Sequence, residues 1–196
     1  MNNIGMLIDV SHISDDAFYQ VIELSKTPVI ASHSSLRKYT PGFERNMNDD
    51  MLLALKKNGG VIQINFGSSF VTAKAGSWGK QLKSTKESAK KEGTKLSNDF
   101  DAAYRAKNPY PFASLEQVLD HIDHVVALIG IDYVGIGSDY DGVGDSLPIG
   151  LKDVSSYPNL IQGLMDRGYS DTDIKKILSG NTLRVWKQAE QYAKSH

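Results

Sequence analysis

Four short apolar runs, each bounded by glycine, proline or polar residues, constrain the fold of this chain more than any other feature. The runs cover residues 5–10, 28–32, 60–66 and 133–137. Each is continuous in apolar or β-branched residues, as in Val29-Ile30-Ala31. Such continuity is typical of strands that helices cover on both faces. The runs therefore predict four strands of a parallel sheet.

Segments with helical periodicity separate the apolar runs and follow the last of them. They cover residues 14–26, 48–58, 114–129, 157–167, 170–178 and 182–193. Ser114 stands three residues before Gln117, which is the spacing of a capping box at the start of a helix. Gly168 and Gly180 stand where helix C-caps are expected. The alternation of strands and helices predicts an α/β fold.

The number of strands sets the expected architecture. Four βα units make half of a (β/α)8 TIM-type barrel, whose complete form takes about 250 residues, whereas this chain has 196. We therefore expect one partial domain over residues 1–196, a half-barrel of four parallel strands with flanking helices. Residues 72–111 interrupt the pattern, and we predict that they form a charged, partly helical and mobile insertion over the top of the fold.

Composition excludes several classes of function. Lys and Arg number 22 against 23 Asp and Glu, so the net charge of -1 gives no excess of positive charge for binding nucleic acid. The chain has no cysteine, so a metal ion would be bound by His, Asp or Glu. No run of 18 apolar residues and no signal sequence is found. As written, the sequence predicts a chain without a membrane segment that stays in the cytoplasm.

Three of the four apolar runs lead into a metal-binding or acidic side chain. His12 follows the first run, His33 follows the second, and Asp139 and Asp141 follow the fourth. The C-terminal ends of parallel strands meet at one mouth of a barrel, so we expect these residues to converge there. Neighbouring strands lie about 4.8 Å apart, which allows His12 and His33 to share one ion such as zinc. A lone histidine is more often structural, but the pair favours a shared metal.

For the other polar residues, a role in the site and a structural role are both possible. His121 and His124 stand three apart on a predicted helix, where a metal site is possible by spacing. We interpret them instead as residues of a solvated helix face. Asp141 is interpreted as a turn residue, and Asp9 either orients His12 or bonds to the neighbouring loop.

Five motifs follow one another in an order that resembles the membrane (renal) dipeptidase family, the zinc metallopeptidases of family M19. They are Ile8-Asp-Val-Ser-His12, Pro28-Val-Ile-Ala-Ser-His33-Ser-Ser35, Arg45-Asn46 with Asp49-Asp50, Gly59-Gly-Val-Ile, and Val134-Gly-Ile-Gly-Ser-Asp139-Tyr-Asp141-Gly142. The resemblance covers nearly the whole chain and implies the C-terminal half of a barrel of the metallo-dependent hydrolase type. An ordered series of motifs is more specific than any one of them.

The resemblance implies a zinc-dependent dipeptidase whose substrates are dipeptides, some family members accepting a D-residue at the C-terminal position. His12 and His33 match the two histidines that bind one of two zinc ions. Asp139 matches the catalytic aspartate that contacts the attacking water and passes its proton to the leaving amine. Arg45 matches the arginine that receives the dipeptide carboxylate, although an arginine before a helix is otherwise more often a surface residue.

The resemblance also implies ligands that lie upstream of the residue matching His12. In the family, a His-x-Asp pair on the first barrel strand binds the other zinc, and a glutamate bridges the two ions. No predicted strand of this chain carries such a pair, so we expect at most one partial zinc site here. We expect a truncated barrel that a homo-oligomer or a complementary half-barrel chain would complete. The alternative is a catalytically inactive remnant that serves as a binding or assembly module.

Overall fold

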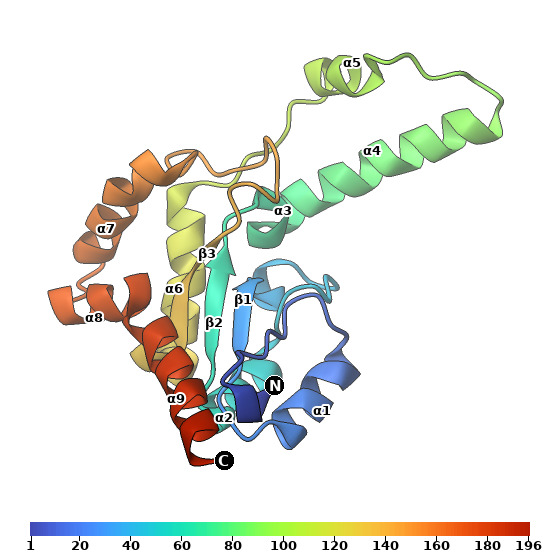
Figure 1. Cartoon of the computed structure of the whole chain (residues 1–196). Coiled ribbons are helices and arrows are strands. Elements are labelled where there is room, and N and C mark those ends of the chain that lie inside the picture. The colour runs from blue at the N-terminus through green and yellow to red at the C-terminus, as the bar shows by residue number, and fades with distance from the viewer.

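A computed structural model describes residues 1–196 as an open three-stranded parallel sheet with helices around it (Figure 1). The strands, in the order β1-β2-β3, are β1 (Ile30–Ser34), β2 (Val61–Asn65) and β3 (Val134–Ser138). The helices are α1 (Asp15–Leu24), α2 (Asp49–Asn58), α3 (Ser68–Val71), α4 (Ala73–Lys91), α5 (Phe100–Lys107), α6 (Leu115–Ile129), α7 (Tyr157–Asp166), α8 (Asp171–Lys175) and α9 (Asn181–Ser195).

The prediction of a fourth strand, over residues 5–10, is wrong. This segment pairs with β1 through a single parallel bridge, Asp9 with Ile30, made by the hydrogen bonds Val10 N to Ile30 O (2.8 Å) and Ile30 N to Ile8 O (3.0 Å). The ladder does not continue because the next available amide of β1, Ser32 N, donates to the Asp9 carboxylate (3.1 Å). A side chain therefore replaces the backbone partner that a strand would need.

The predicted helices are confirmed, and their caps show why they begin where they do. The Ser14 side chain accepts from Ala17 N, and Ser114 with Gln117 forms the expected capping box. Each of these side chains satisfies an amide that the helix itself leaves without a partner. Gly180 is not a C-cap, because a π-helical turn over Lys176–Gly180 continues from α8 into α9.

The two faces of the sheet bury different side chains because residues alternate along each strand. Ile62 and Ile64 of β2 join a large buried cluster that includes Leu52 of α2 and many residues of α6. Val61 packs into a smaller cluster with Val185 of α9. Helices α2 and α6 therefore cover one face, while α9 lies against the other.

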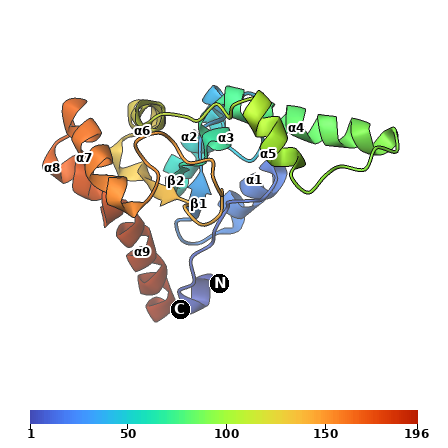
Figure 2. The ribbon, with the colours of Figure 1, turned by 90° about the horizontal axis from the view of Figure 1, so that it is seen from above.

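The insertion over residues 72–111 projects from the sheet as the pair α4 and α5 (Figures 1 and 2). Figure 2 shows this pair on one side of the molecule and α7 with α8 on the other. At its base, Trp78 donates its indole N–H to Asn108 O (2.8 Å) and packs edge-on against Tyr110. Two helices lie within this segment, and its status as a mobile insertion remains a prediction. None of the helices combines the length and the apolar character needed to cross a bilayer.

His121 is not on a solvated helix face, as the sequence suggested, but is fully buried. Its Nδ1 accepts a hydrogen bond from Leu36 N (3.1 Å), and its Nε2 lies 3.0 Å from Val71 O, to which it donates. The ring thus joins the segment after β1 to the end of α3. Burial lowers the pKa of His121 to about 4, because the charged form loses its hydration.

The buried ring makes stability depend on pH. Between the ordinary histidine pKa of about 6.5 and about 4, the unfolded chain binds a proton that folded His121 does not, so stability falls as the pH falls through this window. We expect a loss of up to about 3 kcal/mol in the free energy of unfolding. Urea titrations at pH 7 to 4.5 measure it, and His121→Gln should flatten the dependence. Parallel curves for the two proteins would contradict this assignment.

Candidate metal and substrate site

The structure brings His12 and His33 together at the C-terminal end of the sheet. His33 lies in β1, and His12 follows the segment that bridges to β1. The two Nε2 atoms are 2.8 Å apart, and the ring centroids are separated by 4.9 Å. The two imidazoles therefore present their outer nitrogens to the same small volume.

This arrangement fits two ligands of one zinc ion. Zinc–nitrogen bonds of about 2.0–2.1 Å in tetrahedral geometry separate two nitrogen ligands by about 3.3 Å, which requires only a small separation of the two rings. No group of three or more His, Asp or Glu side chains in the structure is arranged to hold an ion. The residues present thus fit one part of a ligand set, consisting of His12 and His33.

Asp139 follows β3 and faces the same end of the sheet. Asn65, the last residue of β2, donates from its side-chain amide to Asp139 Oδ2 (2.8 Å). Asn65 was not predicted from the sequence, although its position at the end of the third apolar run was a usable signal. Asp139 and His12 both have left-handed backbone conformations, with φ of 63° and 65°. Such conformations are strained for residues other than glycine and concentrate at functional sites.

Gly137 allows β3 to approach β1 although β2 lies between them in the sheet order. A Cβ atom at this position would lie 2.5 Å from Ser32 O and 3.0 Å from the His33 Cα. Only glycine permits so close an approach. The approach draws the end of β3, and Asp139 two residues later, toward His33.

Arg45 lies across the two histidines. It donates from Nη1 to Ser34 Oγ (2.7 Å), from Nη2 to His33 O (2.9 Å) and from Nε to His12 Nδ1 (3.2 Å). The guanidinium also lies 5.3 Å from the centroid of the Phe70 ring, a cation–π contact. Burial lowers the pKa of Arg45, while the charges of Asp139 and Asp9 oppose this shift.

The same charges act on His12. Burial lowers the pKa of His12, and the positive charge of Arg45 and the neighbouring His33 lower it further. The Asp139 and Asp9 carboxylates act in the opposite direction. The net shift is downward, so His12 is neutral at pH 7, as a metal-binding imidazole must be.

Comparison with known proteins assigns the chain to a family. The model of the membrane dipeptidase family, peptidase family M19, matches residues 1–196. The chain belongs to this family. The resemblance found in the sequence motifs is therefore confirmed over the whole length of the chain.

Individual members of the membrane dipeptidase family show the extent of the similarity. Dipeptidase 3 of Mus musculus is 36% identical over 191 residues, which are 97% of this chain and 31% of the mouse protein. The probable dipeptidase PvdM from Pseudomonas aeruginosa superimposes with a TM-score of 0.78 at 30% identity, over 98% of this chain and 52% of that one. A metallo peptidase from Rhodobacter sphaeroides, solved with a phosphinate mimic of the dipeptide L-Ala-D-Ala, gives 0.72 at 26% identity, over 96% of this chain and 44% of that one. The chain thus spans about a third of the curated relative and about half of the solved structures.

A His-x-Asp sequence does occur in this dipeptidase-family chain, at His121-Ile-Asp123, but it lies in α6 and not at a strand end. Both ring nitrogens of His121 bond to backbone groups. Asp123 accepts from Arg167 Nη1 (2.5 Å) and from the Tyr169 hydroxyl (2.7 Å). The pair is therefore structural, and the helix-borne metal site considered as an alternative is wrong.

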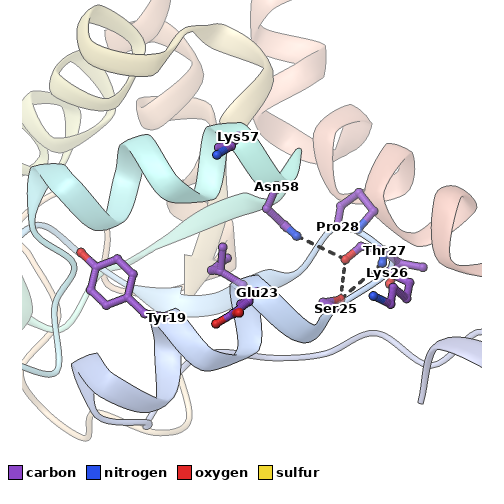
Figure 3. A pocket seen from close by; sticks show the side chains of 9 residues that line it. Tyr19, Glu23, Ser25, Lys26, Thr27, Pro28, Lys57 and Asn58 are labelled. Carbon is purple, nitrogen blue, oxygen red and sulfur yellow. Dashed lines mark hydrogen bonds between the residues drawn. The ribbon is translucent and has the colours of Figure 1, made fainter.

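A pocket of about 510 Å³ lies at the opposite end of the sheet (Figure 3). Its lining includes Thr27 and Pro28, which precede β1, and Asn58, which ends α2 before β2. His12 and His33 lie at the C-terminal end of the sheet, so this pocket is separate from them.

The charge of Arg45 on His12 gives a measurable effect. Arg45→Ala removes a neighbouring positive charge, so we expect the pKa of His12 to rise toward its ordinary value. The pH dependence of the His12 ring chemical shifts in NMR spectra measures it. Arg105→Ala, a variant in the insertion, serves as the control and should leave the His12 titration unchanged. An unaltered His12 titration in Arg45→Ala would contradict the electrostatic coupling.

Proposed function

We propose that this chain supplies one zinc ligand pair, the proton-transfer group and the carboxylate-binding group of a dipeptidase site. The observation that carries the proposal is the 2.8 Å separation of the His12 and His33 Nε2 atoms beside Arg45. Membership of the membrane dipeptidase family and the names of the relatives support it. We further propose that the three-stranded sheet and its helices are part of a (β/α)8 barrel, whose mouth is the end of the sheet where these residues lie.

The proposed chemistry divides among the side chains. His12 and His33 would hold zinc, which supplies a Lewis acid that polarises the scissile carbonyl. Asp139 accepts a proton from the attacking water and returns it to the leaving amine, and Asn65 fixes its orientation through the bond to Oδ2. Arg45 receives the C-terminal carboxylate of the dipeptide through two parallel N–H groups.

The proposed substrates are dipeptides, and a D-residue at the C-terminal position is one candidate class. The Rhodobacter sphaeroides relative was solved with a mimic of L-Ala-D-Ala, which supports this class for the present chain. Because four-coordinate zinc needs more ligands than two histidines, we propose that a second polypeptide segment completes the site. A second copy of this chain and a complementary half-barrel are two candidates.

Hydrolysis of L-Ala-D-Ala and L-Ala-L-Ala by the chain purified in its assembled form, as a homo-oligomer or with a complementary half-barrel, with zinc added and with a chelator, tests the proposal. We expect zinc-dependent release of alanine that the chelator and His33→Ala both abolish. His124→Ala is the matched control, because His124 bonds to Asp49 and Lys38 away from the strand ends. Absence of turnover under every condition, with no zinc bound through His33, would leave only a non-catalytic binding module.

Two further variants separate the roles of Asp139 and Arg45. Asp139→Asn cannot transfer the proton, so we expect kcat to fall about 10²- to 10⁴-fold with KM little changed. Arg45→Ala loses a charge-assisted contact of about 1.5–3 kcal/mol, which corresponds to about 10- to 100-fold in kcat/KM. Steady-state kinetics on one dipeptide measure both. Equal kinetic effects of the two substitutions on KM would contradict the division of roles.

A further inference from the structure

Asp9 accepts three hydrogen bonds beside the proposed zinc ligands. Its Oδ1 accepts from Ser11 N (2.9 Å) and from Ser32 N (3.1 Å), and its Oδ2 accepts from the Ser32 hydroxyl (2.5 Å). The carboxylate thus ties the segment before His12 to the strand that carries His33. Neither oxygen contacts either imidazole, so Asp9 acts on them only through a neighbour.

The hydroxyl of Ser32 passes the influence of Asp9 to His33. Ser32 Oγ lies 2.7 Å from His33 Nδ1. A serine hydroxyl has one proton to donate, and here it goes to the Asp9 carboxylate. Ser32 can therefore only accept from His33, which places the ring proton on Nδ1 and leaves Nε2 unprotonated, with its lone pair as an acceptor.

His12 has the opposite pattern. Its Nδ1 accepts from Arg45 Nε (3.2 Å), so the ring proton lies on Nε2 and points at His33 Nε2 (2.8 Å). These hydrogen bonds form a series in which every donor points the same way, from Arg45 through His12, His33 and Ser32 to Asp9. This series leaves His33, and not His12, in the tautomer that a metal ion on Nε2 requires.

We propose that Asp9 and Ser32 are positioning residues that lock His33 in its Nδ1–H tautomer, with Nε2 ready to bind the metal. This inference rests on the proposed function for the identity of the ligand. The lock itself is a property of the protein alone. A carboxylate, a hydroxyl and an imidazole in series give the ring the same orientation that a carboxylate in direct contact gives to other zinc-binding histidines.

The experiment observes the tautomer directly, by long-range ¹H–¹⁵N NMR of the metal-free protein. In the wild type, we expect the His33 proton on Nδ1. Ser32→Ala removes the acceptor, so the proton should redistribute toward Nε2, and Ser32→Thr, which keeps a hydroxyl, should restore the wild-type spectrum. Asp9→Asn presents an N–H to Ser32 and turns its hydroxyl toward His33, so we expect the proton to move to Nε2.

Zinc affinity is the second measurement, made by competition with a chromophoric chelator. We expect Ser32→Ala and Asp9→Asn to bind zinc about 10- to 100-fold more weakly than the wild type, and Ser32→Thr to bind as the wild type does. Ser170→Ala and Asp173→Asn are matched controls, because Ser170 donates to Asp173 in a capping box that contacts no histidine. The controls should alter neither measurement.

The possible outcomes decide the inference separately from the proposed function. A wild-type His33 proton on Nε2, or a tautomer unchanged in both Ser32→Ala and Asp9→Asn, would overturn it. Unchanged zinc affinity in variants whose tautomer has shifted would overturn it as well. If the wild type binds no zinc while the tautomer follows the expected pattern, the lock stands and the proposed function fails.

Discussion

Parallel pairing of β1, β2 and β3 is the constraint on which the site depends. The register aligns Ile30 with Val61 and Ile62 with Val134, so all three strands end at the same edge of the sheet. His33 and Asp139, which are more than a hundred positions apart in the sequence, therefore lie at the same edge because of strand pairing and not because of a bond between their side chains. Burial of apolar residues against α2 and α6 on one face stabilises this arrangement, and the polar strand ends are carried with it.

The polar groups gathered at this edge bond to one another, although Asp9 and His12 are exposed to solvent. Asn65 donates a hydrogen bond to Asp139, and Arg45 donates to the Ser34 hydroxyl and the His33 carbonyl. Asp9 accepts from the Ser32 hydroxyl. The left-handed backbones of His12 and Asp139 are tolerated within this bonded set. Strain at two residues of one site, held by well-packed strands, is expected where geometry is selected for chemistry and not for stability.

The sequence predicted those parts of the fold that local rules determine. Capping residues such as Ser114 marked the helix starts, and the convergence of His12 and His33 followed from the general rule that parallel strands share one C-terminal edge. The errors arose where a tertiary contact overrides the local pattern. Residues 5–10 look like a strand, but the Asp9 side chain takes the β1 amide that would extend the ladder. The acidic neighbours of His121 suggest a solvated residue. The ring is instead buried, and both of its nitrogens bond to backbone groups of distant segments.

The hydrogen bond from Arg45 to His12 would make the proposed metal binding and the proposed carboxylate binding depend on each other. A metal ion on His12 Nε2 needs the ring proton on Nδ1, whereas the bond from Arg45 Nε needs Nδ1 to be an acceptor. The two interactions are therefore mutually exclusive at this ring. Metal binding at His12 would release the Nε donor of Arg45 while Nη1 and Nη2 stay bonded to Ser34 and His33. A guanidinium released in this way is available to a carboxylate, so occupation of the metal site would prepare the proposed carboxylate-binding site.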